Sequence, residues 1–365
     1  GNTAMKQMII FAGVSAFALS GPAFAEEGTK LMDDAAALAC IQKKLPASSY
    51  VTNDLIPQGD NPVPDGPLAS PVKLKVGLPW VLNDENAPFY NAIEQGFFRD
   101  EGIEVELVPG GPGKNHLQTL AGGAVDVAVL AGGQLVAPAL TSPTPITGVK
   151  VVGSLLKGAP AMFITIDKDL QGRKLTPEDL KGRVVAGPPF TRFFPIMFDR
   201  AGIKPDEVKI VNAGPDPSVL YAGAADFYLG WVFNQPRDIE AKGYAWNGFM
   251  WRDYAFDAYT DVIIMRDEML SDPARQDVAK RFMRATYRGT QYLLDHAEQS
   301  AETAVKYSAD APNMKKEDAL FRFSRQEFLV RGEKGERLLA TDEGFWDRNN
   351  AMLLQYGYMP TIKCD

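Results

Sequence analysis

Aromatic and amide side chains follow the first predicted β-strand, in a loop that could hold a small flat molecule. Trp80 comes directly after the alternating segment 73–78, and Asn83 and Asn86 lie in the same loop. Ligands of open α/β sheets bind at the carboxyl ends of strands, and an aromatic ring there offers stacking worth about 0.5–1.5 kcal/mol beyond its buried area. We therefore predict that these three residues contact a ligand; the alternative is that Trp80 is a core residue.

A second candidate site lies where a tight turn leads into a predicted helix. The turn spans residues 187–192, with Phe190 inside it, Thr191 as the expected helix cap and Arg192 just after. The start of a helix exposes unpaired N–H groups that favour anions, and a threonine cap satisfies one of them. Arg192 would add a bidentate donor for a carboxylate or sulfonate. The alternative for Arg192 is a place on the solvated surface.

A third strand end supplies a glutamine, whereas residues for catalysis are sparse. Gln134 follows two glycines after the predicted strand 126–130, where backbone N–H groups can meet a ligand.

His116 and His296 are the two histidines, and no close Cys/His spacing typical of a metal site occurs. No Gly-x-Ser-x-Gly nucleophile motif occurs either. We expect a binding protein without a metal, a cofactor or catalytic residues.

The elements that must position these residues alternate between strand and helix, a pattern typical of βαβ units and parallel sheets. One set of strands is predicted at 73–78, 102–108, 126–130 and 149–156, and a second at 183–186, 208–212 and 226–229. We interpret segments 161–167 and 261–265 as the two crossovers between the sets. The sequence therefore predicts an α/β protein of two lobes with a cleft between them. Lobe 1 would comprise residues 73–160 plus 261–365 with the C-terminal helices, and lobe 2 residues 161–260.

The N-terminus has the three parts of a cleavable signal peptide. Lys6 gives a positive start, residues 8–19 are apolar and uncharged, and Ala23-Phe24-Ala25 fits a cleavage site. We take Met5 as the natural start, with residues 1–4 as an added remnant. Twelve apolar residues are too few to span a bilayer, which needs roughly 20. We predict that residues 1–25 are removed and that the protein works in the periplasm.

Residues 26–72 form an N-terminal extension, in which a short predicted helix at 31–45 precedes an arm rich in Pro, Gly and Asn. The helix carries Cys40, and the only other cysteine is Cys364. In an oxidising compartment such a pair can form a disulfide; the alternative is two free thiols. Four acidic residues separate Cys40 from the apolar segment. This excludes a lipid-attachment box, so we expect no lipid anchor.

The composition argues against a nucleic-acid partner. The formal charge is −8, and loss of Lys6 with the signal makes it −9, whereas nucleic-acid binding favours a basic stripe. No segment after the signal is long and apolar enough to cross a membrane.

Several motifs, in their order and spacing, resemble those of one known family. They are Lys75-Val-Gly-Leu-Pro-Trp80, Gln95-Gly-Phe-Phe-Arg-Asp-Glu-Gly-Ile-Glu-Val105, Gly122-Gly-Ala-Val-Asp-Val127, Leu180-Lys-Gly-Arg-Val184, Asn234-Gln-Pro, Glu240-Ala-Lys-Gly-Tyr and Ala285-Thr-Tyr-Arg-Gly-Thr-Gln-Tyr292. The family is the thiamine-pyrimidine-precursor and nitrate/sulfonate/taurine type of solute-binding protein for ABC importers, and the resemblance covers roughly residues 73–310.

The resemblance implies a two-lobed periplasmic binding protein fold of type II that closes on a ligand and docks, as a monomer, on an ABC permease in the inner membrane. It implies that Trp80 stacks on a flat ligand. It also implies that Trp231, Asn234, Asp253 and Tyr254 face the cleft, where Asp253 either accepts from the ligand or pairs within the protein.

One loop departs from the family pattern. Thiamine-precursor members usually carry a His followed closely by Gly-Phe-Tyr, whereas Asn86 and Pro88 stand in those places here. Phe89 and Tyr90 could each be a ligand-site residue or a core residue of the following helix. The ligand therefore stays open among pyrimidines, aromatic acids and sulfonates.

Two other functions are compatible with the resemblance. A sensor module that presents a ligand to a membrane receptor would have the same fold. An enzyme of thiamine-pyrimidine synthesis would carry a cysteine-rich motif, and none occurs here.

Overall fold

The computed structural model describes residues 24–365, and the side chains of all of these except Pro189 and Phe190. The predicted signal peptide therefore lies almost entirely outside the described residues. Within them, no helix has both the length and the apolar character that a membrane span requires.

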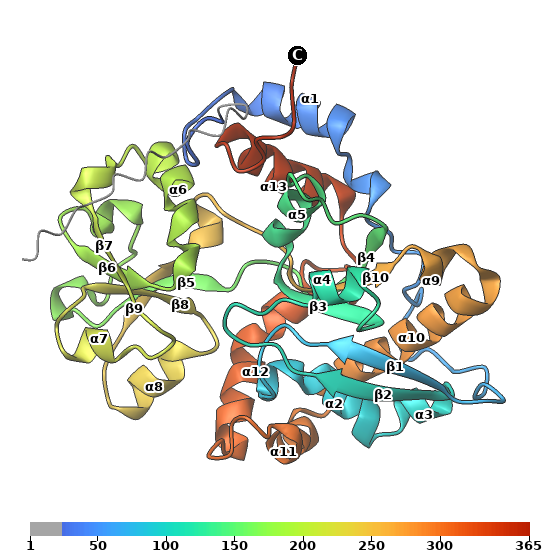
Figure 1. The fold of residues 1–365 in the computed structure, drawn as a ribbon. Helices are drawn as coiled ribbons and strands as arrows, with labels where there is room; N and C mark the ends of the chain where they lie inside the picture. The colour runs from blue at the N-terminus through green and yellow to red at the C-terminus, as the bar shows by residue number, and fades with distance from the viewer. Residues whose placement is uncertain (1–23) are drawn as a thin grey trace, which may run out of the picture.

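Lobe 1 is built on a five-stranded sheet with the order β2-β1-β3-β10-β4 (Figure 1). Its strands are β1 (Val72–Gly77), β2 (Ile103–Val108), β3 (Val127–Gly132), β4 (Val149–Leu156) and β10 (Thr260–Arg266). β1 runs parallel to β2 and β3, but β10 runs antiparallel to β3 and β4. The sheet therefore contains the predicted parallel pairs, but β10 makes it mixed.

Lobe 2 has a second mixed sheet with the order β7-β6-β8-β5-β9. Its strands are β5 (Ala161–Thr165), β6 (Val184–Gly187), β7 (Lys209–Asn212), β8 (Phe227–Trp231) and β9 (Asn247–Met250). β6 pairs in parallel with β7 and β8, and β5 pairs antiparallel with β8 and β9. The expected α/β fold of two lobes, each a sheet flanked by helices, is confirmed.

The two predicted crossovers are wrong. Segment 161–167 contains β5, and segment 261–265 lies within β10. Both strands lie in the interior of their sheets and are mostly buried, which explains their apolar sequences. The chain instead passes between the lobes at residues 157–160 and 251–259, just before these strands.

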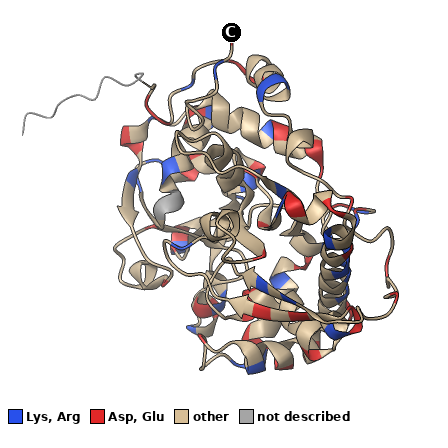
Figure 2. Cartoon of the chain, turned by 45° about the vertical axis from the view of Figure 1, so that its right-hand side comes forward, with Lys and Arg blue, Asp and Glu red and all other residues tan. Residues whose placement is uncertain are grey.

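Helices cover both sheets. They are α1 (Asp34–Lys44), α2 (Ala87–Glu94), α3 (Phe97–Asp100), α4 (Leu117–Ala121), α5 (Val136–Leu140), α6 (Phe194–Ala201), α7 (Ser218–Tyr221), α8 (Gln235–Ala241), α9 (Glu268–Ser271), α10 (Pro273–Asp295), α11 (Ala297–Tyr307), α12 (Lys316–Arg331) and α13 (Glu343–Gln355). α2 and α3 are separate helices because Gly96 adopts a left-handed φ of 76° that ends the first one. Basic and acidic residues are scattered over the helices and loops of both lobes (Figure 2).

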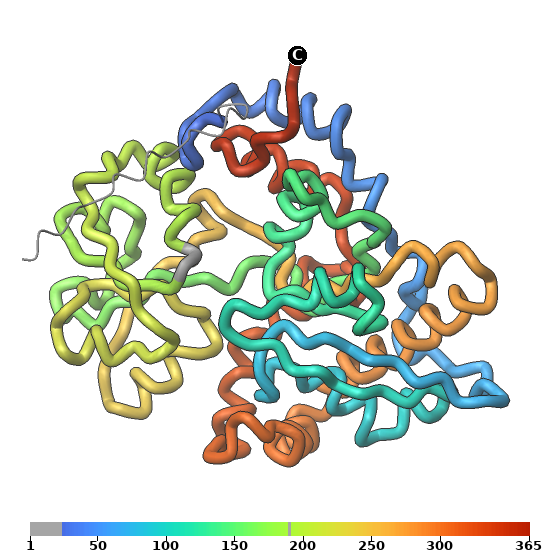
Figure 3. The backbone as a smooth tube through the Cα atoms, viewed as in Figure 1, coloured from blue at the N-terminus to red at the C-terminus, as the bar shows by residue number. Residues whose placement is uncertain are grey.

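The two ends of the chain lie side by side and contact both lobes. Cys40 on α1 and Cys364 form a disulfide with a Cα–Cα distance of 5.6 Å, which confirms the predicted bridge. Figure 3 shows α1 and α13 running together across the top of both lobes. We call this pair of helices, together with residues 356–364, the strap.

Candidate ligand site between the lobes

The ends of four strands, two from each lobe, line one small cavity between the lobes. Its walls include Gly132 and Gln134 after β3, Pro188 after β6, Trp231 at the end of β8 and Thr260 at the start of β10. Of the residues predicted to bind a ligand, the structure brings Gln134 and Trp231 together here. The cavity volume is about 40 Å³, whereas ligand sites usually measure about 300–1,000 Å³. A small molecule therefore needs the lobes to separate before it can enter.

Aromatic rings form much of this cavity, and one of them carries a free donor. Trp251, Phe193 and Phe256 line it together with Trp231. Trp251 is 1% exposed, and no acceptor in residues 24–365 reaches its Nε1. A buried indole N–H usually has a partner, and this one has none among the described residues. Trp251 was not predicted as a site residue, because a buried tryptophan between two lobes has no distinctive local pattern.

A second cavity, of about 350 Å³, opens between α8 of lobe 2 and α12 and the loop before α2 in lobe 1. It brings together the predicted residues Asn83 and Asn234 and adds Asp84, Arg237 and Arg322. We call Asp84, Glu85, Arg237, Asp261 and Arg322 the charged cluster. None of these five residues was predicted.

Asp84 forms one ion pair within lobe 1 and a second, longer one with lobe 2. Arg322 Nε lies 2.8 Å from Asp84 Oδ1, with side chains only 3% and 2% exposed. Arg237 Nη1 approaches Asp84 Oδ2 from lobe 2 at 3.5 Å. The Arg322 guanidinium also lies over the Phe233 ring, 4.6 Å from its centroid. One carboxylate of lobe 1 is thus shared by an arginine of each lobe.

Two further carboxyl groups lie behind Asp84. Burial raises the pKa of Asp261 well above its usual range, and the charge of nearby Glu85 adds to that rise. Burial also raises the pKa of Glu85. No hydrogen-bond donor in the described chain reaches Glu85 Oε1 or Asp261 Oδ1, so both carboxyl groups favour the neutral form. Asp261 has a φ of 55°, a left-handed conformation that Asp and Asn tolerate best among residues with a side chain.

The remaining predicted residues of the first loop have packing partners. Trp80 is half-buried after β1, and Asn86 donates from Nδ2 to the carbonyl of Val81 at 3.1 Å. Phe89 and Tyr90 are fully buried. Phe89 stacks with Phe282, and Tyr90 stacks with Tyr307 at 5.3 Å. The structure places both aromatic residues in the core of lobe 1 and not in either interlobe cavity.

The predicted turn before α6 also differs in detail. The helix begins at Phe194, after a 3-10 turn, and Phe193 is its N-cap, so the expected cap at Thr191 is wrong. Arg192 is exposed and pairs with Glu27 at 2.7 Å. The side chain of Phe190 is outside the described part of the structure. The start of α6 is therefore built differently from the predicted anion site.

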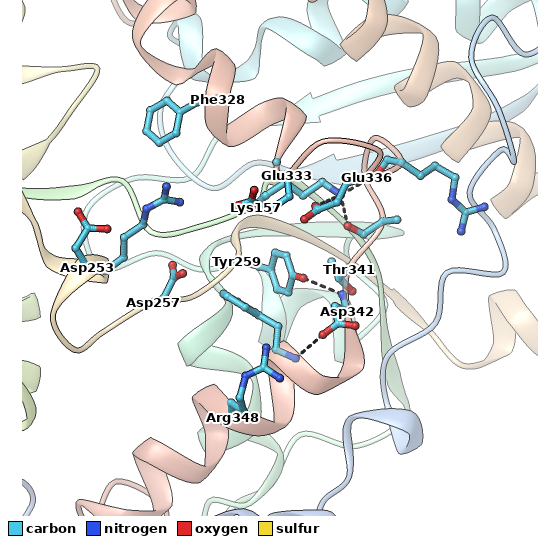
Figure 4. A pocket seen from close by; sticks show the side chains of 15 residues that line it. Lys157, Asp253, Asp257, Tyr259, Phe328, Glu333, Glu336, Thr341, Asp342 and Arg348 are labelled. Carbon is cyan, nitrogen blue, oxygen red and sulfur yellow. Dashed lines mark hydrogen bonds and ion pairs between the residues drawn. The ribbon is translucent and has the colours of Figure 1, made fainter. Parts of the chain in front are cut away.

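Asp253 and Tyr254 lie in the connection back to lobe 1 but not in the interlobe cavities. Tyr254 donates to the carbonyl of Leu175 at 3.3 Å and packs on Phe249. Asp253 lines a larger cavity, of about 820 Å³, behind the two connections (Figure 4). We call this the hinge cavity.

The return connection is a wall between two cavities. Phe256 and Thr260 line the interlobe cavity, whereas Asp257 and Tyr259 line the hinge cavity. Burial lowers the pKa of Lys157 in the hinge cavity to about 8, and its Nζ donates to the Arg337 carbonyl at 2.8 Å. The side chains that line this cavity include both acidic and basic groups, whose charges largely balance.

No group of three or more His, Cys, Asp or Glu suited to a metal occurs in residues 24–365.

A family model described as NMT1/THI5 like matches residues 83–300, which is more than half of the chain. The chain belongs to the NMT1/THI5-like family. It is 26% identical over 245 residues to the formylaminopyrimidine-binding protein of Halalkalibacterium halodurans, a match covering 65% of this chain and 71% of that relative.

Solved structures share the fold of this NMT1/THI5-like protein. The periplasmic aliphatic sulphonate binding protein SsuA from Escherichia coli aligns with a TM-score of 0.54 and 14% identity, over 70% of this chain and 84% of SsuA. The ligand-binding component of an ABC-type import system from Staphylococcus aureus aligns with a TM-score of 0.53 and 13% identity, over 79% and 93%. These likenesses establish the two-lobed fold.

Proposed function

We propose that this protein is the solute-binding component of an ABC importer and captures a planar heteroaromatic molecule between its lobes. The observation that carries the proposal is the meeting of strand ends from both lobes around Trp231, Trp251 and Gln134. Aromatic walls with a few polar groups are typical of small-molecule sites. The family and the name of the relative from Halalkalibacterium support a pyrimidine as the ligand.

The polar groups of the cavity favour a ligand with a hydrogen-bond acceptor. The free Trp251 Nε1 can donate to a ring nitrogen or a carbonyl oxygen. By contrast, the charges of Arg237 and Arg322 beside the cleft are both paired with the Asp84 carboxylate, although Arg322 Nη1 has no hydrogen-bond partner among residues 24–365. Arg192 is likewise paired, with Glu27. A neutral heteroaromatic ligand therefore fits this cleft better than a ligand with an acid group, which would need an unpaired cation of the protein.

The predicted signal and the disulfide support a place in the periplasm, where an ABC permease would receive the closed protein. The chain after the expected cleavage site docks on the folded protein, because Gly28 N donates to the Tyr356 carbonyl at 2.7 Å. In this mechanism the lobes separate, the ligand enters, and closure buries it.

Titration of the purified protein with a formylaminopyrimidine tests this function. We expect saturable binding that raises the melting temperature and that Trp231→Ala abolishes. Trp246→Ala is the matched control, because Trp246 belongs to the same lobe but does not line the interlobe cavity. A melting temperature unchanged by pyrimidines, aromatic acids and sulfonates alike would remove the support for this function.

A further inference from the structure

The lobes are held together by different contacts on two sides of the cleft. On the side of α8 and α12, Arg237 Nη1 donates to the Asp318 carbonyl at 2.9 Å and approaches Asp84 at 3.5 Å. A second pair, Arg325 Nη2 with Glu240 Oε1 at 3.0 Å, also joins α12 to α8. These polar contacts are few and partly exposed to water.

On the other side, the strap packs on both lobes. In lobe 1, Trp346 of α13 packs against Tyr259 with ring centroids 5.4 Å apart. In lobe 2, Tyr356 donates to Asp199 Oδ2 at 2.6 Å and Tyr358 donates to the Arg192 carbonyl at 2.5 Å. The disulfide fixes the end of the chain to α1. The strap is therefore a third connection between the lobes, in addition to residues 157–160 and 251–259.

The chemical difference between the two sides determines where the lobes can part. The strap side buries aromatic and aliphatic side chains of α13 in one continuous core with α6 of lobe 2, and separating it would expose that apolar surface to water. The α8 side also contains an apolar contact, the Phe233 ring against the Arg322 guanidinium, but its other named contacts are polar groups that water can replace. The exposed pair of Arg325 and Glu240 contributes only about 0–1 kcal/mol.

We propose that Arg237 is the positioning residue that holds lobe 2 closed, and that the lobes open only at the side of α8 and α12 while the strap side stays in contact. Arg237 is suited to this role because it reaches two groups of lobe 1 at once, the Asp84 carboxylate and the Asp318 carbonyl. This role of Arg237 rests on the proposed function in one respect, that closure of the lobes retains a solute. Opening of the lobes can be measured without a ligand, so the test below uses the ligand-free protein.

Distances between pairs of spin labels, measured by double electron–electron resonance, test the proposal. One label pair, at Ala241 and Glu317, reports on the α8 side; a second, at Thr144 and Lys204, reports on the strap side. All four residues are exposed, and the native cysteines are already joined to each other. We expect Arg237→Met to lengthen and broaden the first distance and to leave the second unchanged.

Controls separate this role from a general loss of stability. Lys242→Met removes an exposed cation of the same region that pairs only within lobe 2, with Asp238, and should change neither distance. Glu240→Gln removes the second interlobe pair and should widen the first distance less than Arg237→Met does. An unchanged first distance in Arg237→Met, or equal widening of both distances, would overturn the proposal. Because the distances are measured in the ligand-free protein, a failure of the protein to bind a pyrimidine would not change their outcome.

Discussion

Asp84 and Arg322 form an almost completely buried ion pair at the base of the cleft, with Nε and Oδ1 2.8 Å apart. The pair joins the loop after β1 to α12, and Phe233 of lobe 2 closes over the guanidinium. The cleft is therefore organised around a charge pair of lobe 1 that lobe 2 covers.

Removal of the arginine should destabilise the protein strongly. Arg322→Met leaves the Asp84 carboxylate buried without its close partner, and breaking one side of a buried ion pair typically costs about 3–5 kcal/mol. Urea unfolding at neutral pH measures this loss. The control on the same helix is Arg331→Met, whose exposed pair with Glu327 should matter by less than about 1 kcal/mol. Equal losses in the two variants would contradict the assigned importance of the buried pair.

The buried carboxyl groups make stability depend on pH. Because burial raises the pKa of Glu85 and Asp261 in the folded protein, the folded state binds more protons than the unfolded chain above about pH 4. The free energy of unfolding should therefore fall as the pH rises from about 4 through the raised pKa values. Asp261→Asn should flatten this dependence and increase stability at pH 8, since Asn tolerates the left-handed φ and can donate to Glu85.

Chemical denaturation at several pH values checks this expectation. Glu104→Gln is the control, because Glu104 is exposed on the edge strand β2 and its replacement should leave the pH dependence intact. A steeper fall of stability with pH in Asp261→Asn would contradict the raised pKa values of the two buried carboxyl groups.

Reduction of the disulfide should lower the melting temperature. Cys40 and Cys364 close a loop with a sequence separation of 324, and in the chain-entropy model a bridge over so long a loop contributes up to about 5 kcal/mol. Since the chain has two cysteines, dithiothreitol acts on this bridge alone. The double variant Cys40→Ala/Cys364→Ala should melt at the temperature of the reduced protein and be insensitive to the reductant. Equal melting temperatures of the oxidised and reduced protein would contradict a stabilising strap.

The Trp251 indole should contribute to ligand affinity through its N–H group. Trp251→Phe keeps an aromatic ring but removes the donor, and loss of one hydrogen bond should weaken binding about threefold to tenfold. Calorimetric titration measures the change. In the matched variant Trp246→Phe, the lost donor points to Glu240, and affinity should not change. If both variants bind equally well, Trp251 does not donate to the ligand.

The order of the elements could be predicted from the sequence because most strands carry a strong local pattern. β4 was predicted with its observed bounds. β9 was missed because its sequence, Asn-Gly-Phe-Met, neither alternates nor forms an apolar run. The strands that neighbour β5 in one sheet and β10 in the other could not be predicted, because an apolar segment does not specify its neighbours or their direction.

The candidate site could be predicted in part, from strand ends and from the family resemblance. Gln134 follows β3 and lies at the interlobe cavity, where Trp231, which the resemblance placed in the cleft, also lies. Arg322 looked like any arginine on an amphipathic helix, and its burial depends on Asp84 and Phe233, which are far away in the sequence. Contacts between lobes have no local signal, so the charged cluster emerged only from the structure.

Isothermal titration of the oxidised, signal-free protein with a formylaminopyrimidine measures whether the lobes capture such a solute. We expect one site per chain, a negative heat-capacity change from burial of the ring, and no detectable heat with Trp231→Ala. Binding that is unaffected by Trp231→Ala, or no binding of this ligand or of any other planar heteroaromatic solute, would contradict capture between the lobes.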